Sequence, residues 1–227
     1  MEKKRLLVAA LPMELPPSLA HSLKRKMPAF IPMDEERLVG VTGVGKSNVT
    51  RFYRRLERMA IQIEKMLLIG FAGSLCESLP PGKIVTFDKV ITYQGKVFSL
   101  FPVGKLHRSI GLEVREWTDA GEKRRLRVAH PHAEIIDMET ATHAEECARL
   151  GVKLSVLRIV TDGPEDRLPS LAYIFEDWQH VVWKKILSHP LHGLGGLMFS
   201  WRLWKARESL TKEVEKLEEW HDFLENA

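Results

Sequence analysis

The chain has 227 residues, 44% of them hydrophobic and 28% charged, with a formal net charge of +4. This composition suffices for the core of a soluble protein, and no apolar run approaches the roughly 20 residues that would span a bilayer. The two cysteines, Cys76 and Cys147, lack the spacing of metal ligands, which argues against a zinc site and a disulfide framework and fits a reducing cytoplasm.

The N-terminal half alternates apolar strands with helices, and the chain start indicates a first strand rather than a signal peptide. The expected strands are residues 5–10, 38–42, 65–71 and 83–92, and the expected helices are residues 17–25 and 48–63. Turn residues separate them: Met13-Glu14, Gly43-Val44-Gly45-Lys46, Ala72-Gly73-Ser74 and Pro80-Pro81-Gly82.

The C-terminal half continues this alternation after a polar segment, residues 98–132, that predicts no element. Helix 139–150, strand 154–160 and helix 170–187 follow. Strands that alternate with helices predict a single α/β domain over residues 1–190, with a central, mixed, mostly parallel twisted sheet flanked by helices.

The last residues differ in character. A turn-rich break at residues 189–196 precedes an expected helix at 197–224, which carries Trp201, Trp204 and Trp220 among charged residues. We expect this C-terminal helical extension, residues 191–227, to pack on its own domain or on a partner. A peripheral contact with a membrane surface stays open.

Three acidic residues stand where strands end. Asp137 and Glu139 lie where a strand passes into a helix, and Asp162 follows the strand 154–160. Acidic residues are common helix caps, and this alternative is the stronger one for Asp137. Ligands of open α/β sheets, however, collect at the carboxyl ends of strands, so the pattern also predicts an active site.

Three other kinds of site are not favoured. The Gly43-x-Gly45-Lys46 loop lacks the glycine spacing of a Walker phosphate loop, although its N–H groups could line a ligand pocket. The nine histidines form no ligand motif, so we expect no metal. Lys and Arg cluster without interleaved aromatic residues, which favours solvated helix faces over a nucleic-acid surface.

Four motifs occur in a fixed order over residues 5–165. They are Leu6-Leu-Val-Ala-Ala-Leu-Pro-Met-Glu14; Val41-Thr-Gly-Val-Gly-Lys-Ser-Asn48; Leu67-Leu-Ile-Gly-Phe-Ala-Gly-Ser-Leu75 with Pro81-Gly-Lys-Ile-Val-Thr86; and Asp137-Met-Glu-Thr-Ala141 with Val160-Thr-Asp162. Together they resemble the nucleoside phosphorylase and nucleosidase superfamily, which includes methylthioadenosine/S-adenosylhomocysteine nucleosidases. The resemblance implies a phosphorylase-like fold and an enzyme that cleaves N-glycosidic bonds without a cofactor.

The resemblance also implies roles for individual residues. Asp162, kept neutral by the apolar strand before it, would hold a proton toward the leaving purine. Glu139 would hydrogen-bond the ribose hydroxyls as positive charge builds on the sugar, and Glu14 would position and deprotonate water. Met138 would pack under the sugar. The other expected substrate-binding residues are Thr161, Phe71, Ala72, Gly73, Gly43 and Val44. The residue that stacks on the base is not assigned.

The sequence favours water over phosphate as the nucleophile. A phosphorylase needs cations, usually arginine, at its phosphate. In phosphorylase relatives one arginine lies just before the G-x-x-G turn, where this chain has Met66-Leu-Leu-Ile-Gly70. Glu14 would also repel phosphate. A phosphate-dependent purine nucleoside phosphorylase stays the alternative.

The tail from Asp162-Gly-Pro-Glu-Asp-Arg onward resembles the hopanoid-associated branch, which removes adenine from adenosylhopane. We therefore expect a cytoplasmic homo-oligomer that binds a small purine nucleoside. The candidate substrates are adenosylhopane and methylthioadenosine/S-adenosylhomocysteine. The alternative of another class is a non-catalytic interaction module, in which the tryptophans dock a partner and the carboxylates are caps.

Overall fold

The computed structural model describes residues 3–20, 23, 28–116, 118–166, 190–217 and 220, with only the backbone for residues 190–200. The predicted alternation of strands and helices holds only in part, because four strands follow one another in the middle of the chain. The elements are β1 (Lys4–Ala9), the 3-10 helix η1 (Pro12–Glu14), α1 (Pro17–Ala20), β2 (Ala29–Pro32), β3 (Arg37–Val41), α2 (Lys46–Arg58), β4 (Ile63–Ser74), β5 (Ile84–Ile91), β6 (Val97–Ser99), β7 (His107–Glu113), α3 (Ala120–Ala129), β8 (Ile135–Asp137), α4 (Thr140–Leu150), β9 (Lys153–Asp162) and α7 (Pro190–Glu215).

The strands form one mixed sheet, part of which closes into a barrel. β2, β3 and β1 lead to β4, and β4, β8, β7, β5 and β9 then pair in a ring, because β9 hydrogen-bonds to both β5 and β4. Five of the nine pairings between described strands are parallel. The predicted mixed α/β sheet is thus confirmed, whereas its closure was not foreseen.

The long strand β4 is the centre of this arrangement. It pairs in parallel with β1 on one side and with β9 on the other, and its register with β9 places Gly70 beside Arg158 and Gly73 beside Asp162. The residues Met66, Leu67, Leu68 and Ile69 are fully buried, as expected for a parallel strand that is covered on both faces. The register of β4 and β9 therefore fixes which side chains meet at the ends of these strands.

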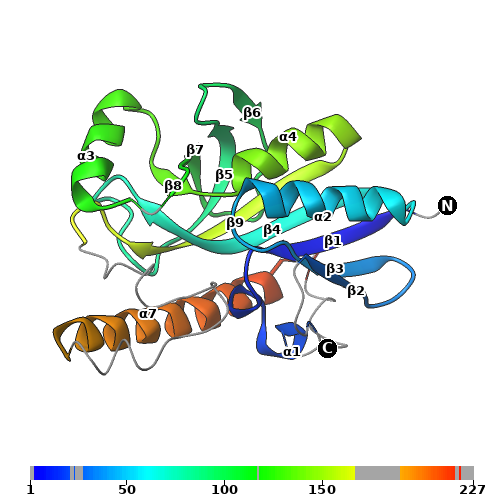
Figure 1. Cartoon of the computed structure of the whole chain (residues 1–227), viewed down its shortest axis with the longest axis horizontal. Helices are drawn as coiled ribbons and strands as arrows, with labels where there is room; N and C mark the ends of the chain where they lie inside the picture. The colour runs from blue at the N-terminus through cyan, green and yellow to red at the C-terminus, as the bar shows by residue number, and fades with distance from the viewer. Residues whose placement is uncertain are drawn as a thin grey trace.

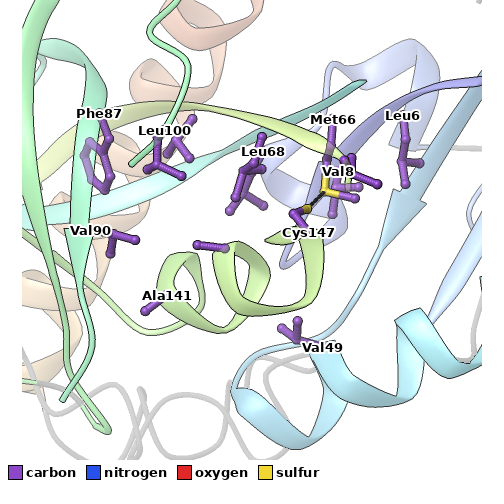
Figure 2. Close-up of a cluster of buried hydrophobic side chains, with 14 of the residues drawn as sticks. Leu6, Val8, Val49, Met66, Leu68, Phe87, Val90, Leu100, Ala141 and Cys147 are labelled. Atoms are coloured by element: carbon purple, nitrogen blue, oxygen red, sulfur yellow. Dashed lines mark hydrogen bonds between the residues drawn. The ribbon is translucent and has the colours of Figure 1, made fainter. Parts of the chain in front are cut away.

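Helices cover both faces of the sheet. Figure 1 shows α2 and α4 on one face and α7 on the other, with α3 beside one end of the barrel. On the α4 face, Met66 and Leu68 of β4 pack with Ala141 and Cys147 of α4, as Figure 2 shows. A second cluster joins β1 and β9 to α7 through Leu7, Leu157, Leu210 and Val214, among others. Both faces of β4 are thereby removed from water.

The predicted break before the last helix is wrong. The described helix α7 begins at Pro190 and continues through Gly193, Gly195 and Gly196. A proline fits the first turn of a helix, where its missing N–H is not needed. The expected helix 170–187 lies outside the described residues, as do most of residues 21–27 and 218–227.

Four elements were not predicted: β2, β6, β7 and α3. β6 has only three residues and none of them is buried, and β7 begins with two exposed residues and shows no regular alternation of buried and exposed positions. In α3 the one buried residue is Lys123, so this helix has no apolar stripe that periodicity could detect. None of the described helices is long and apolar enough to cross a membrane.

We predict that Leu210→Ala destabilises the protein by about 2–5 kcal/mol, because Leu210 of α7 is fully buried against β1 and β9 and its truncation leaves a cavity. Urea unfolding measures the change. Glu208→Ala, at an exposed position on the same helix, should shift the free energy of unfolding by about 0.5 kcal/mol or less. Equal midpoints for the two variants would show that α7 is not part of the folded core.

Candidate active site

The segments that follow β1, β3 and β8 meet beside β4. The N–H of Gly43 donates to the carbonyl of Ala10 (2.9 Å), which ties the loop after β3 to the end of β1. The N–H of Phe71 donates to Glu14 Oε1 (3.0 Å), which ties η1 to β4. The N–H of Gly45 donates to Glu139 Oε1 (3.0 Å). Residues from four distant parts of the sequence are thus held together.

Glu14 is buried in this region. Its second oxygen, Oε2, accepts from the N–H of Leu11 (2.8 Å), so both carboxyl oxygens have a backbone donor. Burial raises the pKa of Glu14, and the nearby Arg158 guanidinium and these backbone hydrogen bonds oppose that rise. A carboxyl group whose pKa is raised toward neutrality is suited to accept a proton from water.

Arg158 is the cation of this cluster, although the sequence analysis assigned it no role. Its Nε donates to Asp137 Oδ2 (2.9 Å) and its Nη2 donates to the hydroxyl of Thr140 (2.9 Å). A Cβ at Gly70 would clash with Arg158 Nη1 and would lie 2.8 Å from Glu14 Oε1. Glycine at position 70 therefore leaves the space in which the guanidinium and the Glu14 carboxylate approach each other.

The two acidic residues around Met138 have different roles in the structure. Asp137 Oδ1 accepts from the N–H of Thr140 (3.1 Å) in the first turn of α4, which confirms the capping interpretation for Asp137. The Glu139 side chain makes no cap on its own helix and binds the Gly45 N–H instead. Burial, and next the negative charge of Asp137, raise the pKa of Glu139 to about 8, while Arg158 lowers it.

Asp162 is the last residue of β9 and is almost fully buried. Gly73 of β4 faces it, and a Cβ there would lie 2.9 Å from Asp162 Oδ2. The Thr161 hydroxyl donates to Asp162 Oδ1 (2.8 Å). Asp162 also forms an ion pair with the buried ammonium of Lys123. The apolar surround expected from the sequence is therefore wrong, because a charged partner touches the carboxyl group.

The other predicted binding residues lie in the same region. Met138 follows β8 and is half-buried, and Val44 is half-buried in the loop before α2, where its carbonyl accepts from Asn48 Nδ2 (2.8 Å). The remaining ones are on or next to strand ends: Gly43 after β3, Phe71, Ala72 and Gly73 in β4, and Thr161 in β9. The sheet topology explains their proximity. β3 pairs in parallel with β1, and β1 and β9 pair in parallel with β4, so the carboxyl ends of these four strands lie at the same edge of the sheet.

The site thus has two poles along β9. One pole holds Glu14, Asp137 and Glu139 around Arg158, and the other holds the ion pair of Asp162 and Lys123. The two poles are four residues apart in β9, which corresponds to roughly 13 Å of extended strand. In the described part of the chain, no group of three or more His, Cys, Asp or Glu side chains could hold a metal ion.

Both cations of the site were missed by the sequence analysis. Arg158 stands inside an apolar strand, and a lone charge in such a run is the signal that could have revealed it. Lys123 lies in the polar segment 98–132 and beside two arginines, Arg124 and Arg125, whose side chains are exposed. No local pattern distinguishes the buried cation from these neighbours, so only the tertiary structure identifies it.

The fold resembles that of solved nucleosidases. The adenine-bound methylthioadenosine/S-adenosylhomocysteine nucleosidase (MTAN) of Chlamydia trachomatis aligns with a TM-score of 0.64 and a sequence identity of 16%. The alignment covers 98% of this chain and 100% of that one. A mutant MTAN of Helicobacter pylori with 5′-methylthioadenosine in its active site aligns with a TM-score of 0.64 and 15% identity, over 96% of this chain and 100% of that one. A mutant futalosine hydrolase of Helicobacter pylori aligns with a TM-score of 0.57 and 16% identity, over 70% of this chain and 90% of that one.

No family model matches the sequence, and no curated protein matches it either. The structural similarity establishes that the chain has the fold of these nucleosidases, and the fold that its four motifs predict is confirmed.

We predict that Glu139→Gln becomes more stable relative to the wild type as the pH rises from about 5 to 9. Glu139 has a pKa of about 8 in the folded protein against 4.5 as its ordinary value. The folded state therefore binds more protons between these values, and the stabilisation present at low pH is lost as the pH rises through 8. Glutamine does not titrate and escapes this loss.

The difference in melting temperature between the variant and the wild type, measured across this pH range, tests the prediction. Glu35→Gln, at an exposed position, controls for the removal of one negative charge. A difference for Glu139→Gln that stayed constant with pH would contradict the raised pKa.

Proposed function

We propose that this protein is a nucleosidase that hydrolyses the N-glycosidic bond of a purine nucleoside. The observation that carries the proposal is the buried cluster of Glu14, Glu139 and Arg158 near Gly70 of β4, with the buried Asp162 four residues further along β9. Cleavage of such a bond passes through a sugar with oxocarbenium character, so anionic groups close to the sugar stabilise the transition state. The solved nucleosidases of the same fold include proteins bound to adenine and to 5′-methylthioadenosine.

In this proposal the sugar lies at the Glu14 pole. Glu14 takes a proton from the attacking water, a role that fits a buried carboxyl group whose pKa is raised. Glu139 accepts hydrogen bonds from the ribose hydroxyls, and these strengthen as positive charge develops. Met138, between Asp137 and Glu139, packs under the sugar. Arg158 holds Asp137 in place and offsets the negative charge around it.

The charges at this pole favour water over phosphate. Arg158 supplies the cation that the segment Met66–Gly70 lacks, but its Nε is already paired with Asp137, 2.9 Å away. Glu14 lies beside the same guanidinium, and Glu139 adds a third acidic side chain. A phosphate dianion would have to compete with Asp137 for this guanidinium, and the Asp137 carboxylate would repel it. Hydrolysis is therefore favoured over phosphorolysis.

We predict that Glu14→Gln lowers the rate of hydrolysis by about 10²–10⁴-fold, the usual contribution of a positioned base. Purified protein is incubated with adenosine and 5′-methylthioadenosine, and free adenine and free sugar are measured. Glu208→Gln, at an exposed position of α7, should keep wild-type activity. A sugar phosphate among the products, or acceleration by added phosphate, would establish a phosphorylase instead.

At a finer level, we propose that the base is adenine and that the substrate carries an apolar substituent, as in adenosylhopane. Trp201 and Trp204 support this idea, because 56% and 60% of their surfaces are exposed. Arg202 of the same helix segment donates to Asp166 (3.1 Å), and Asp166 in turn accepts from the N–H of Gly163 (2.9 Å). This tryptophan pair therefore lies on a segment that contacts the loop after Asp162. A homo-oligomer, a cytoplasmic location and membrane contact stay predictions.

We predict that the double variant Trp201→Ala with Trp204→Ala loses about tenfold or more of its activity on an adenosine with a long 5′ alkyl chain, because it loses apolar contact area. Its activity on 5′-methylthioadenosine should stay near that of the wild type. Steady-state kinetics on both substrates provide the comparison. An equal loss on both would assign the tryptophans a structural role only.

A further inference from the structure

The helix α7 carries apolar residues on two opposite faces. Its inner face packs on the sheet through Ala206, Leu210 and Val214, which are at most 5% exposed. Trp201 precedes Leu210 by about two and a half helical turns and therefore lies on the outer face, where Trp201 and Trp204 are 56% and 60% exposed. A helix that packs on a protein core by one face normally has polar residues on the other. The outer face of α7 departs from this pattern.

The apolar pattern of the outer face continues toward the start of the helix. Positions 194, 197 and 198 precede Trp201 by seven, four and three residues, the spacing that places residues on one side of a helix. The sequence has leucine, leucine and methionine at these positions, and the backbone is helical there. We call positions 194, 197, 198, 201 and 204 the outer stripe. It runs along about 15 Å of the helix, which lies along the lower edge of the molecule in Figure 1.

The charges around the outer stripe are positive. Residues 190–207 contain Arg202, Lys205 and Arg207 and no acidic residue. Arg202 and Arg207 have partners within the protein. Lys205 is exposed, and its Nζ lies 3.8 Å from the centre of the Trp201 ring. An ammonium group is thus held on the same face of the helix as the tryptophans.

An exposed tryptophan pair beside a cation matches the chemistry of an anionic lipid surface. Tryptophan combines an apolar ring with a polar N–H, and it is enriched where a membrane meets water. A lysine beside it keeps its alkyl stem on apolar surface while its ammonium reaches the lipid phosphates. A second copy of this face would instead bring further cations, and residues 190–207 offer no acidic side chain to meet them. The charge therefore favours a lipid surface over self-association.

We propose that the outer stripe of α7 docks the protein on an anionic membrane surface. Trp201 and Trp204 lie at the boundary between headgroups and acyl chains, and Lys205 lies at the lipid phosphates. The helix stays parallel to the surface, because its inner face remains packed on β1 and β9. This docking goes beyond the proposed hydrolysis and needs no nucleoside.

The first test uses the full-length wild-type protein and two kinds of vesicle. One kind contains phosphatidylcholine and phosphatidylglycerol in equal parts, and the other contains phosphatidylcholine alone. Flotation measures the partition coefficient. We expect the anionic vesicles to bind at least about fivefold more tightly, which is the contribution of one cation near such a surface, and added salt to weaken binding. Equal partition into both kinds of vesicle, or no binding to either at low salt, would overturn the proposal.

The second test changes the outer stripe. We expect Trp201→Ala with Trp204→Ala to lower the partition coefficient on anionic vesicles by about tenfold or more, because apolar contact area is lost. Lys205→Glu reverses a charge at the surface, and we expect a loss of about tenfold or more from it as well. Lys205→Glu keeps both tryptophans, so it decides the question if the double variant does not unfold cooperatively. Wild-type partition in a folded variant of either kind would refute docking through this stripe.

A matched control is available in the turn between β5 and β6. Tyr93 is 56% exposed, as Trp201 is, and the Arg115 guanidinium lies 4.0 Å from the centre of the Tyr93 ring. We expect Tyr93→Ala and Arg115→Glu to bind anionic vesicles as the wild type does. Losses equal to those of the stripe variants would show a general attraction of the protein to lipid and would contradict docking through α7.

Sedimentation equilibrium separates a membrane from a second copy of the chain. A wild type that self-associates, a tryptophan double variant that is monomeric, and no vesicle binding by either would make the outer stripe an interface between copies and the proposal wrong. The result does not depend on the proposed function. A protein that binds the vesicles but releases no base from nucleosides would contradict only the nucleosidase proposal, and the reverse result would contradict only the docking.

Discussion

The site depends on one buried guanidinium. Arg158 is in the interior of β9, where an unpaired charge would be strongly unfavourable, and the structure surrounds it with Asp137, Thr140 and Glu14. Gly70 provides the room for this contact on the neighbouring strand. The arginine in turn allows two further carboxyl groups to be buried with it. Without its positive charge, burial and mutual repulsion would raise the pKa of Glu14 and of Glu139 further.

The barrel makes this arrangement possible. Glu14, Gly70, Asp137 and Arg158 come from η1, β4, β8 and β9, and β4 pairs with both β8 and β9. Closure of the ring through β5 and β7 fixes the relative positions of these strands, so their terminal side chains have few conformational alternatives. A site in which charges must meet at hydrogen-bond distance requires such rigid support.

Local signals in the sequence predicted much of the fold and part of the site. Continuous apolar runs such as residues 65–71 specify buried strands, and the motifs at Glu14 and Glu139 lie in segments that the structure brings together. The sequence did not reveal Arg158 or Lys123, because their importance arises from partners that are distant along the chain. Closure of the sheet was missed for the same reason: it depends on the pairing of β9 with β5, between strands about 70 residues apart. The break expected before α7 failed because Pro and Gly were taken as stops, although proline suits a first helical turn.

The C-terminal helix belongs to the same physical unit as the site. Leu210 and Val214 complete the apolar cluster on one face of the sheet, and Arg207 Nε donates to the carbonyl of Leu15 (2.7 Å), directly after Glu14. A backbone carbonyl next to η1 is thereby held by a residue 192 positions away. Removal of the tail would expose the core and release this contact at once, so loss of activity in a truncated chain would say nothing about substrate binding. Exposed side chains of α7 are different, because they can be changed without either effect, and they are the part of the tail on which a role in recognition can be examined.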